Sequence, residues 1–439
     1  MYKKLIFGTL SLFFMLQVFS QEVTNTITVD EKTYTMYLNK QWKELVETGK
    51  LAKKKNIDFY YLQYRMGVAY YELNNYRKAI PFFEKVLILQ PQDKVVQEYL
   101  YYSYLLAGRE DDARILANKF TPEMRDKLKL RNKDLIVDGL GLEYEKYLFD
   151  DYSPSENPSD TIEQRIRKDL GYFNLSLTHH SRKKFTLNHS FSYLLGNNLV
   201  YNPEYDIHKF DETVKQFQYY ISGSWNLNKG SKLKLGFHYV NTKLEALNPD
   251  SQMGNGNGRV NDYYLYFQNI NSIVGFATYS KSISYFNLKA STSVSNLGSS
   301  FQVLPLVGVD YFPFGNTNLV LGSELIYQSP SDGQDFDPGL IVKQKIGVRL
   351  FKSLWVEPFM QYGKVTNFVD NDASVIYNNP DILNNWYGVN LNLNLSKKGL
   401  TLYFIYQQYS NTNSYKINES DQTVDYNSQT FLGGLKWKF

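Results

Sequence analysis

The sequence predicts a multidomain α+β chain, with an N-terminal α-helical module followed by an antiparallel transmembrane β-barrel. The period of the apolar residues is 3.6 from about Tyr34 to Leu130, and it becomes 2 from about Asp134 onward. Short and long polar connections then alternate along the second part. After the N-terminus, no apolar run approaches the ~20 residues that a membrane helix needs, whereas barrel strands need no such run.

Composition excludes several classes of function. The 439 residues include no cysteine, which excludes disulfides, thiolate metal sites and cysteine nucleophiles. Lys and Arg number 48 against 44 Asp and Glu, so the charge balance gives no indication of a nucleic-acid partner. The 38 tyrosines exceed what the core of a soluble protein requires.

The N-terminus has the pattern of a secretory signal peptide. A basic segment at residues 2–4 precedes an apolar stretch, residues 5–19, that is too short to span a membrane as a helix. Residues 18–20 then offer a cleavage site before Gln21, and the alternative is a retained anchor helix. Without a cysteine at that site, lipoprotein processing is excluded. We therefore expect a signal peptide over 1–20, a periplasmic helical domain over 21–130 and a barrel over 134–439.

Residues 60–93 carry small and aromatic residues at a characteristic spacing: Met66, Gly67, Tyr70, Tyr76, Ala79, Phe83 and Pro91. This spacing resembles the tetratricopeptide repeat of about 34 residues. Gly67 and Ala79 would let two helices approach closely, although Gln63 and Val86 depart from the usual repeat pattern. Degraded copies on either side suggest about three repeats over residues 30–128. An ordinary helical hairpin bundle is the alternative.

The resemblance to this repeat implies a concave face made by the first helix of each repeat. Four tyrosines would lie on that face: Tyr61, Tyr64, Tyr71 and Tyr102. Aromatic side chains add contact area at low entropy cost, so such a face suits an extended peptide of a protein partner. The alternative is that these tyrosines pack on neighbouring helices or on the barrel rim.

The second part of the chain repeats one strand pattern many times. The clearest example is 387–396, where Tyr, Val and Leu alternate with Gly, Asn and Ser. Similar alternation recurs at 173–178, 185–193, 217–227 and 233–239. A soluble sandwich would need a very large core to bury so many aromatic-rich faces, so a transmembrane barrel is favoured.

The connections predict the strand count and the sides of the membrane. Short turns are expected at about 181–184, 228–231, 270–273, 312–316, 352–353 and 397–399, and long polar loops at about 149–168, 196–213, 244–259, 329–339, 368–384 and 410–428. If 274–295 is one long strand, or a strand with a bulge and a short loop, the barrel has 14 strands, with 12 or 16 as alternatives. The N- and C-termini of the barrel, and the helical module, then face the periplasm. No connection is long enough to demand a plug.

The last strand, residues 429–439, alternates apolar and polar residues and stops on an aromatic residue. This pattern resembles the C-terminal strand of bacterial outer-membrane β-barrels. The resemblance implies that Trp437 and Phe439 form the signal read by the barrel-assembly machinery. The alternative is an edge strand that ends a soluble sandwich.

No catalytic, metal-binding or cofactor-binding motif is found in the sequence, and we predict no enzyme activity and no cofactor. His179 and His180 are interpreted as a pair at the barrel rim, and His189 falls on the apolar face of its strand. The acidic residues from Asp332 to Asp337 lack the spacing of a calcium-binding loop. The charged side chains assigned to the lumen by their parity are Glu143, Glu145, Lys234, His238, Glu324, Lys345, Arg349, Glu357, Lys436 and Lys438. They would either close the lumen through ion pairs or line a water-filled path.

The order of signal peptide, short repeat module and C-terminal barrel resembles two groups, the YaiO-like barrel proteins and the Slam proteins. The family role of the Slam proteins is to move lipoproteins to the cell surface. The first hypothesis is therefore a non-enzymatic outer-membrane barrel whose periplasmic module binds a protein partner or exported client. Its other expected partners are outer-membrane lipid and the barrel-assembly machinery. The alternatives are a porin-like channel for small molecules and a barrel enzyme that modifies envelope lipid or polysaccharide.

Overall fold

The computed structural model describes residues 25–130, 137–153, 162–180, 184–203, 209–247, 265–299, 301–329, 339–379, 381–395 and 399–438. These residues form two compact units, one ending at Leu106 and the other beginning at Ala107. The expected signal peptide, the acidic loop from Asp332 and the terminal Phe439 lie outside the described residues.

The first unit consists of five α-helices in chain order. They are α2 (Thr26–Leu38), α3 (Trp42–Lys54), α4 (Tyr60–Glu72), α5 (Tyr76–Leu89) and α6 (Lys94–Leu106), and each packs against the next. Asn25 caps α2, because its side chain accepts a hydrogen bond of 2.9 Å from the backbone of Thr28. None of the described helices combines the length and the apolar content that crossing a membrane requires.

Close helix packing explains the small residues of the repeat. A Cβ atom on Gly67 of α4 would lie 2.6 Å from the ring of Phe83 on α5. A side chain at this position would therefore push the two helices apart. Leu62, Met66 and Phe83 are fully buried between the helices. The predicted repeat over 60–93 is thus present as the helix pair α4–α5.

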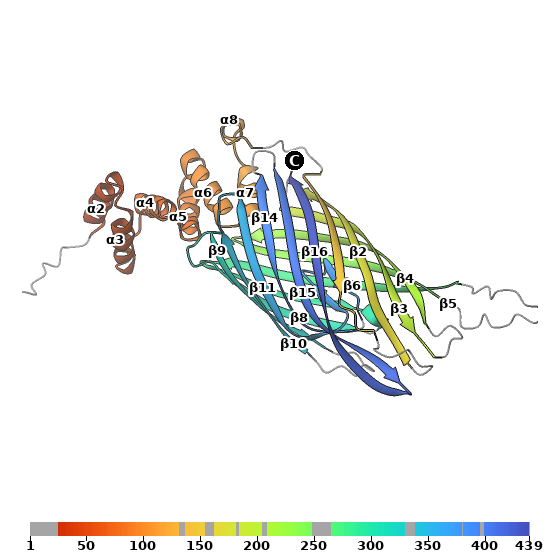
Figure 1. Ribbon diagram of the computed structural model, residues 1–439. Coiled ribbons are helices and arrows are strands. Elements are labelled where there is room, and N and C mark those ends of the chain that lie inside the picture. Colours follow the sequence, from red (N-terminus) through yellow and green to blue (C-terminus); the bar gives the residue numbers. More distant parts are fainter. Residues whose placement is uncertain are drawn as a thin grey trace, which may run out of the picture. The chain divides into compact units, whose positions relative to one another are not determined.

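The second unit begins with two short helices, α7 (Glu110–Ala117) and α8 (Pro122–Lys127), and continues as a β-barrel. The barrel strands are β1 (Gly139–Phe149), β2 (Ile162–His180), β3 (Phe185–Tyr201), β4 (Lys209–Asn228), β5 (Ser231–Leu247), β6 (Leu265–Ile283), β7 (Phe286–Ser295), β8 (Gln302–Tyr311), β9 (Leu319–Gln328), β10 (Gly339–Arg349), β11 (Leu354–Val365), β14 (Ile382–Leu395), β15 (Leu400–Ile417) and β16 (Ser420–Lys438). All neighbours are antiparallel, and β1 pairs with β16 to close the barrel (Figure 1). The predicted count of 14 strands is confirmed.

The two faces of the barrel wall differ in chemistry. Large apolar side chains such as Phe173, Phe217 and Tyr387 are exposed on the outer face. Polar side chains such as Gln218 and Ser222 are buried on the inner face. An outer face of this kind is stable only in contact with lipid, so the fold is a transmembrane β-barrel.

We call the end where β1 begins and β16 ends the terminal end, and the opposite end the far end. At the terminal end, α7 is attached to the barrel by ion pairs. Asp111 lies 2.7 Å from Lys232 of β5, and Glu110 lies 2.7 Å from Lys438 of β16. The Asp111 carboxyl is partly desolvated by burial, but Lys232 and then Arg114 hold its pKa below the usual range.

Two predicted connections were wrong. Residues 270–273 continue β6, and the actual turn falls at residues 284–285, between β6 and β7, so 274–295 is not one strand. Residues 410–428 form no long loop, because β15 and β16 run through this polar stretch to a turn at residues 418–419 (Figure 1). Asn418 and Glu419 both have positive φ, the backbone of a tight hairpin turn.

A third connection differs more consequentially. Residues 368–384 were expected to form a loop outside the barrel, and no plug was expected. Instead, a short hairpin of β12 (Phe368–Asp370) and β13 (Val375–Tyr377) contacts the inner face of the barrel. We call residues 366–379 the internal hairpin. It occupies the lumen, because its side chains reach inward-facing residues of strands on several sides.

Candidate functional site: an internal hairpin and a cavity in the barrel

The tip of the internal hairpin has an unusual backbone. Asn371, Asp372 and Ala373 follow one another with φ angles of 50°, 54° and 56°. This left-handed region costs about 1–2 kcal/mol for a residue such as Ala373, and less for Asn and Asp, whose short polar side chains tolerate it better. The tip therefore depends on contacts with the barrel wall for its conformation.

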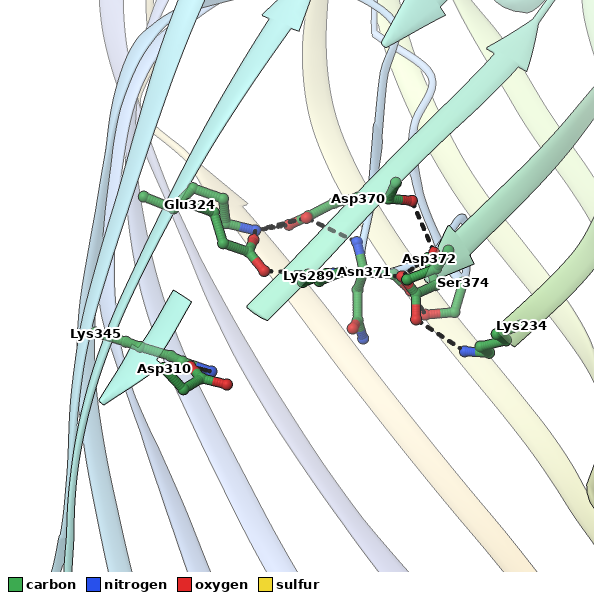
Figure 2. Close-up of polar contacts among 12 residues, drawn as sticks. Lys234, Lys289, Asp310, Glu324, Lys345, Asp370, Asn371, Asp372 and Ser374 are labelled. Atoms are coloured by element: carbon green, nitrogen blue, oxygen red, sulfur yellow. Dashed lines mark hydrogen bonds and ion pairs between the residues drawn. The ribbon is translucent and has the colours of Figure 1, made fainter. Parts of the chain in front are cut away.

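Ion pairs hold the tip from several strands (Figure 2). The Asp372 carboxylate lies 3.1 Å from Lys234 of β5 and 3.3 Å from Lys289 of β7, and Thr278 of β6 donates to it at 2.9 Å. Both oxygens of Asp370 accept from Lys343 of β10, at 2.5 and 2.6 Å. Each charge of the tip is thus neutralised by the wall, as a partly buried charge requires.

The wall also satisfies the backbone carbonyls of the hairpin. The Tyr220 hydroxyl donates to the Asp372 carbonyl at 3.3 Å, and the His238 ring bonds the Ala373 carbonyl at 2.7 Å. Gln328 donates to the carbonyl of Thr366 at 2.6 Å. These bonds satisfy three carbonyls of the hairpin, whereas Nε2 of His238 and Oε1 of Gln328 are buried without a hydrogen-bond partner among the described residues.

Apolar packing seats the two strands of the hairpin. Phe368 is fully buried, and its ring lies 6.1 Å from that of Trp386 on β14. Tyr377 lies 5.5 Å from the same tryptophan ring. A small cavity of about 20 Å³, which is about the room of one water molecule, lies between the tip and strands β6–β9.

On the other side of the hairpin, a cavity of about 770 Å³ remains. Its lining includes Phe368, Tyr377 and Asn378 of the hairpin, together with residues of β2–β6, β11 and β14–β16. The volume lies within the range of small-molecule sites, about 300–1,000 Å³. The hairpin therefore fills one part of the lumen and leaves a ligand-sized space in another.

The charged residues assigned to the lumen fall into two groups, those beside the hairpin tip and those away from it. Lys234 contacts the hairpin tip, and Glu324 lies 3.3 Å from Lys289 beside it. Glu143 accepts from Asn174 at 3.0 Å, whereas Glu145 is buried and accepts from Tyr147 at 3.1 Å.

The remaining residues of that set lie away from the tip. Glu357 accepts from Asn390 at 3.2 Å, and Lys345 lies 3.2 Å from Asp310. Arg349 donates to Thr317 at 2.7 Å, near the terminal end. The Lys436 ammonium lies 4.8 Å from the centroid of the Tyr403 ring. Sequence reasoning missed Lys289, Lys343, Asp370 and Asp372, which make most of the contacts at the tip.

The other described histidines make local contacts. His179 and His189 lie 2.9 Å apart on neighbouring strands, and His180 bonds Asp138. Trp437 lies on the outer face and is 45% exposed. Among the described residues, no three His, Asp or Glu side chains are placed to hold a metal ion.

The four predicted tyrosines of the helical module differ in exposure. Tyr61 is 58% exposed, and the other three are partly buried. The Tyr71 ring lies 4.9 Å from that of Tyr99 and 5.2 Å from that of Tyr76. Burial, together with these neighbours, raises the pKa of the Tyr71 phenol to about 12.

Tyr64 and Tyr102 also have aromatic neighbours. Tyr64 of α4 lies 6.1 Å from Tyr37 of α2, and Tyr102 lies 5.4 Å from Tyr101 within α6. Burial raises the pKa of the Tyr64 phenol, and the hydrogen bond with Tyr37 adds to the shift. Tyrosines on α2, α4 and α6 thus form a partly exposed aromatic surface on one side of the module, which we call the tyrosine surface (Tyr37, Tyr61, Tyr64, Tyr71 and Tyr99).

Comparisons with known proteins agree with the repeat and give a remote likeness for the barrel. A family model described as tetratricopeptide repeat matches residues 60–93. A comparison with proteins of curated function finds no match to this chain.

Among solved structures, the chain is similar to the Pseudomonas putida toluene transporter TodX, with 8% identity, a TM-score of 0.45 and coverage of 74% of this chain and 94% of that one. It is also similar to a Pseudomonas aeruginosa FadL homologue, with 10% identity, a TM-score of 0.46 and coverage of 77% and 94%. The β domain of the Bordetella autotransporter BrkA scores 0.34 at 10% identity and covers 70% of this chain and all of that one. A likeness at this level says nothing of what the present chain binds.

Proposed function

We propose that this protein is a non-enzymatic barrel of the bacterial outer membrane whose helical module binds a protein partner in the periplasm. The observation that carries the proposal is the tyrosine surface. Tyr61 is 58% exposed on a helix pair that matches a repeat used for protein binding. Exposed aromatic residues on a rigid helical scaffold are typical anchors of interfaces.

An extended peptide segment is the partner form that fits best. The tyrosine surface includes residues of three helices, α2, α4 and α6, and so offers contacts spread along the module rather than in a single pocket. Alanine replacement of an interface tyrosine typically costs more than about 1 kcal/mol of binding energy if it is a hot spot. The same side chains contribute little to folding where they are exposed.

Site-specific photo-crosslinking in the full-length protein tests this proposal. A photoreactive phenylalanine at Tyr61 should give a defined adduct in cells, and adding Tyr64→Ala should weaken it. The matched control is the same reagent at Ile88, which is 75% exposed on α5, the second helix of the pair. Equal labelling at both positions, or no adduct at Tyr61, would contradict partner binding by this surface.

The orientation belongs to the same proposal. With the terminal end of the barrel in the periplasm, the turn at Asn418 faces outside and the helical module faces the periplasm. A protease site inserted at Asn418 should be cut on intact cells, whereas one inserted at Asn56 should be cut only after the outer membrane is opened. The reverse pattern would contradict this topology.

The internal hairpin favours a second candidate function, regulated passage of solutes through the barrel. Ion pairs with three lysines, rather than covalent bonds, hold its tip. Planar-bilayer recordings should show little conductance for the wild type. A variant in which a short Gly-Ser linker replaces residues 368–377 should conduct steadily. Equal conductance of the two proteins would exclude the hairpin as a barrier.

A further inference from the structure

The cavity beside the internal hairpin contains an arginine that forms no ion pair with the described residues. Arg167 of β2 lines the cavity and is partly buried. Its guanidinium donates to the backbone carbonyl of Asn378 at 3.3 Å. Among the described residues, no carboxylate lies within ion-pair distance of it. A guanidinium held only by a neutral carbonyl keeps donors and charge available for an anion.

Of the other charged side chains in the described lining, Arg165, Glu212 and Asp169 are in ion pairs, whereas Asp381 and Glu163 are not. Glu212 is bound by Arg165 at 2.9 Å and by Asn198 at 2.8 Å. Asp381 accepts from Asn413 at 2.8 Å and from the Tyr426 hydroxyl at 2.6 Å.

Two acidic residues of the lining remain to be considered. Asp169 is paired with Lys146. Glu163 is exposed and lies four residues from Arg167, about 13 Å along the strand. That distance exceeds the Debye length of about 8 Å at physiological salt, so Glu163 does little to cancel the charge of Arg167.

Neutral hydrogen-bonding groups also line the cavity. The Asn378 amide donates to Gln216 at 3.3 Å and to Thr242 at 3.3 Å, and all three side chains line the cavity. Asn198 and Asn411 line it as well. Amides and hydroxyls both donate and accept, which suits the hydroxyl groups of a ligand. The partly buried ring of Tyr377 gives the cavity an apolar wall on the hairpin side.

We infer that this cavity binds a small hydroxyl-bearing carboxylate of the sugar-acid class. Arg167 pairs with the carboxylate, and the amide and hydroxyl side chains around it bind the ligand's hydroxyl groups. The lining residues all belong to the barrel unit, and binding requires no passage through the barrel, so the inference goes beyond the function proposed above. A ligand at Arg167 would also compete with the Asn378 carbonyl and so touch the stem of the hairpin.

Titration calorimetry on the full-length protein in detergent tests the inference, with sodium glucuronate as the probe. Glucuronate should bind the wild type, whereas glucose, which lacks the carboxylate, should bind at least about ten-fold more weakly. Octanoate, a carboxylate without hydroxyl groups, should also bind more weakly. Arg167→Gln should weaken glucuronate binding at least about ten-fold, and Arg167→Lys should restore part of the loss.

Two controls separate binding from folding. Arg349→Gln removes the same charge at a site that binds Thr317 outside the cavity, and it should leave glucuronate affinity unchanged. The melting temperature of Arg167→Gln should differ from that of the wild type by no more than the melting temperature of Arg167→Lys does. Absence of glucuronate binding, equal binding of glucose or octanoate, or full affinity in Arg167→Gln would each overturn the inference.

Discussion

Two polar stretches of the sequence form hairpins that lie in very different places. The internal hairpin, between β11 and β14, lies inside the barrel, whereas the β15–β16 hairpin extends past the end of β1. Turn chemistry does not explain the difference. Both tips contain residues with positive φ, Asn371 to Ala373 in one and Asn418 with Glu419 in the other. The difference follows from the groups that each hairpin can bind or pair with.

The tip of the internal hairpin carries two carboxylates that meet lysines on three strands of the wall. The β15–β16 hairpin instead continues its strand pairing to the turn, from Leu400 opposite Trp437 to Ile417 opposite Ser420. Backbone pairing satisfies its polar groups without the lumen. A polar segment in a barrel thus folds inward when the lumen supplies matching counter-charges, and outward when it can complete a ladder.

The largest expected effect comes from reversing the charge at the internal tip. Asp372→Lys places a third cation beside Lys234 and Lys289, and the repulsion should release the hairpin from its seat. Planar-bilayer conductance should rise from near zero to a steady open level. Glu419→Lys makes the same change at the tip of the other hairpin and should leave conductance unchanged. A closed barrel in Asp372→Lys would show that the ion pairs do not hold the hairpin.

A smaller effect is expected from removing one cation of the wall. Lys343→Gln leaves the Asp370 carboxylate without its ion pair, in a site where both groups are partly buried. Full burial would cost about 3–5 kcal/mol, and partial solvation reduces this to about 1–3 kcal/mol. Urea unfolding in micelles measures the change. Lys416→Gln, on an exposed face of β15, is the matched control and should stay within about 0.5 kcal/mol.

The smallest effect is expected at the turn between β15 and β16. Asn418 has a φ of 49°, so Asn418→Ala should cost about 1 kcal/mol locally. Amide hydrogen exchange should quicken in residues near the turn, while conductance stays at the wild-type level. Faster exchange across the whole barrel would indicate that the β15–β16 hairpin also helps to keep the barrel closed.

The barrel itself could be predicted because its wall has a period that solvent and lipid impose. Apolar residues face lipid and polar residues face the lumen, so the alternation and the count of 14 strands are both present in the sequence. The turn at 284–285 was missed because the polar residues at 270–273 resembled a turn more than the actual one does. Polar composition alone does not distinguish a strand that lines a lumen from a loop.

The internal hairpin could not be predicted from the sequence for the same reason. Asp370 and Asp372 lie in a stretch rich in Asn and Asp, which reads equally well as an exposed loop. One signal could have suggested otherwise. Lys234, Lys289 and Lys343 all face inward by parity, so the strands bring several cations into the lumen that need partners. Parity identified Lys234 and Glu324, but the contacts between distant segments could not be read from periodicity.

The position of the internal hairpin can be measured directly, because the chain has no cysteine and a single one can be placed at will. Asn371→Cys and Asn418→Cys, each in full-length protein on intact cells, are treated with a bulky polyethylene-glycol maleimide. The cysteine at 418 should react readily. The cysteine at 371 should stay unmodified in the otherwise wild-type barrel and become reactive when Asp372→Lys is added. Equal and rapid labelling at both positions without that substitution would contradict a hairpin seated inside the barrel.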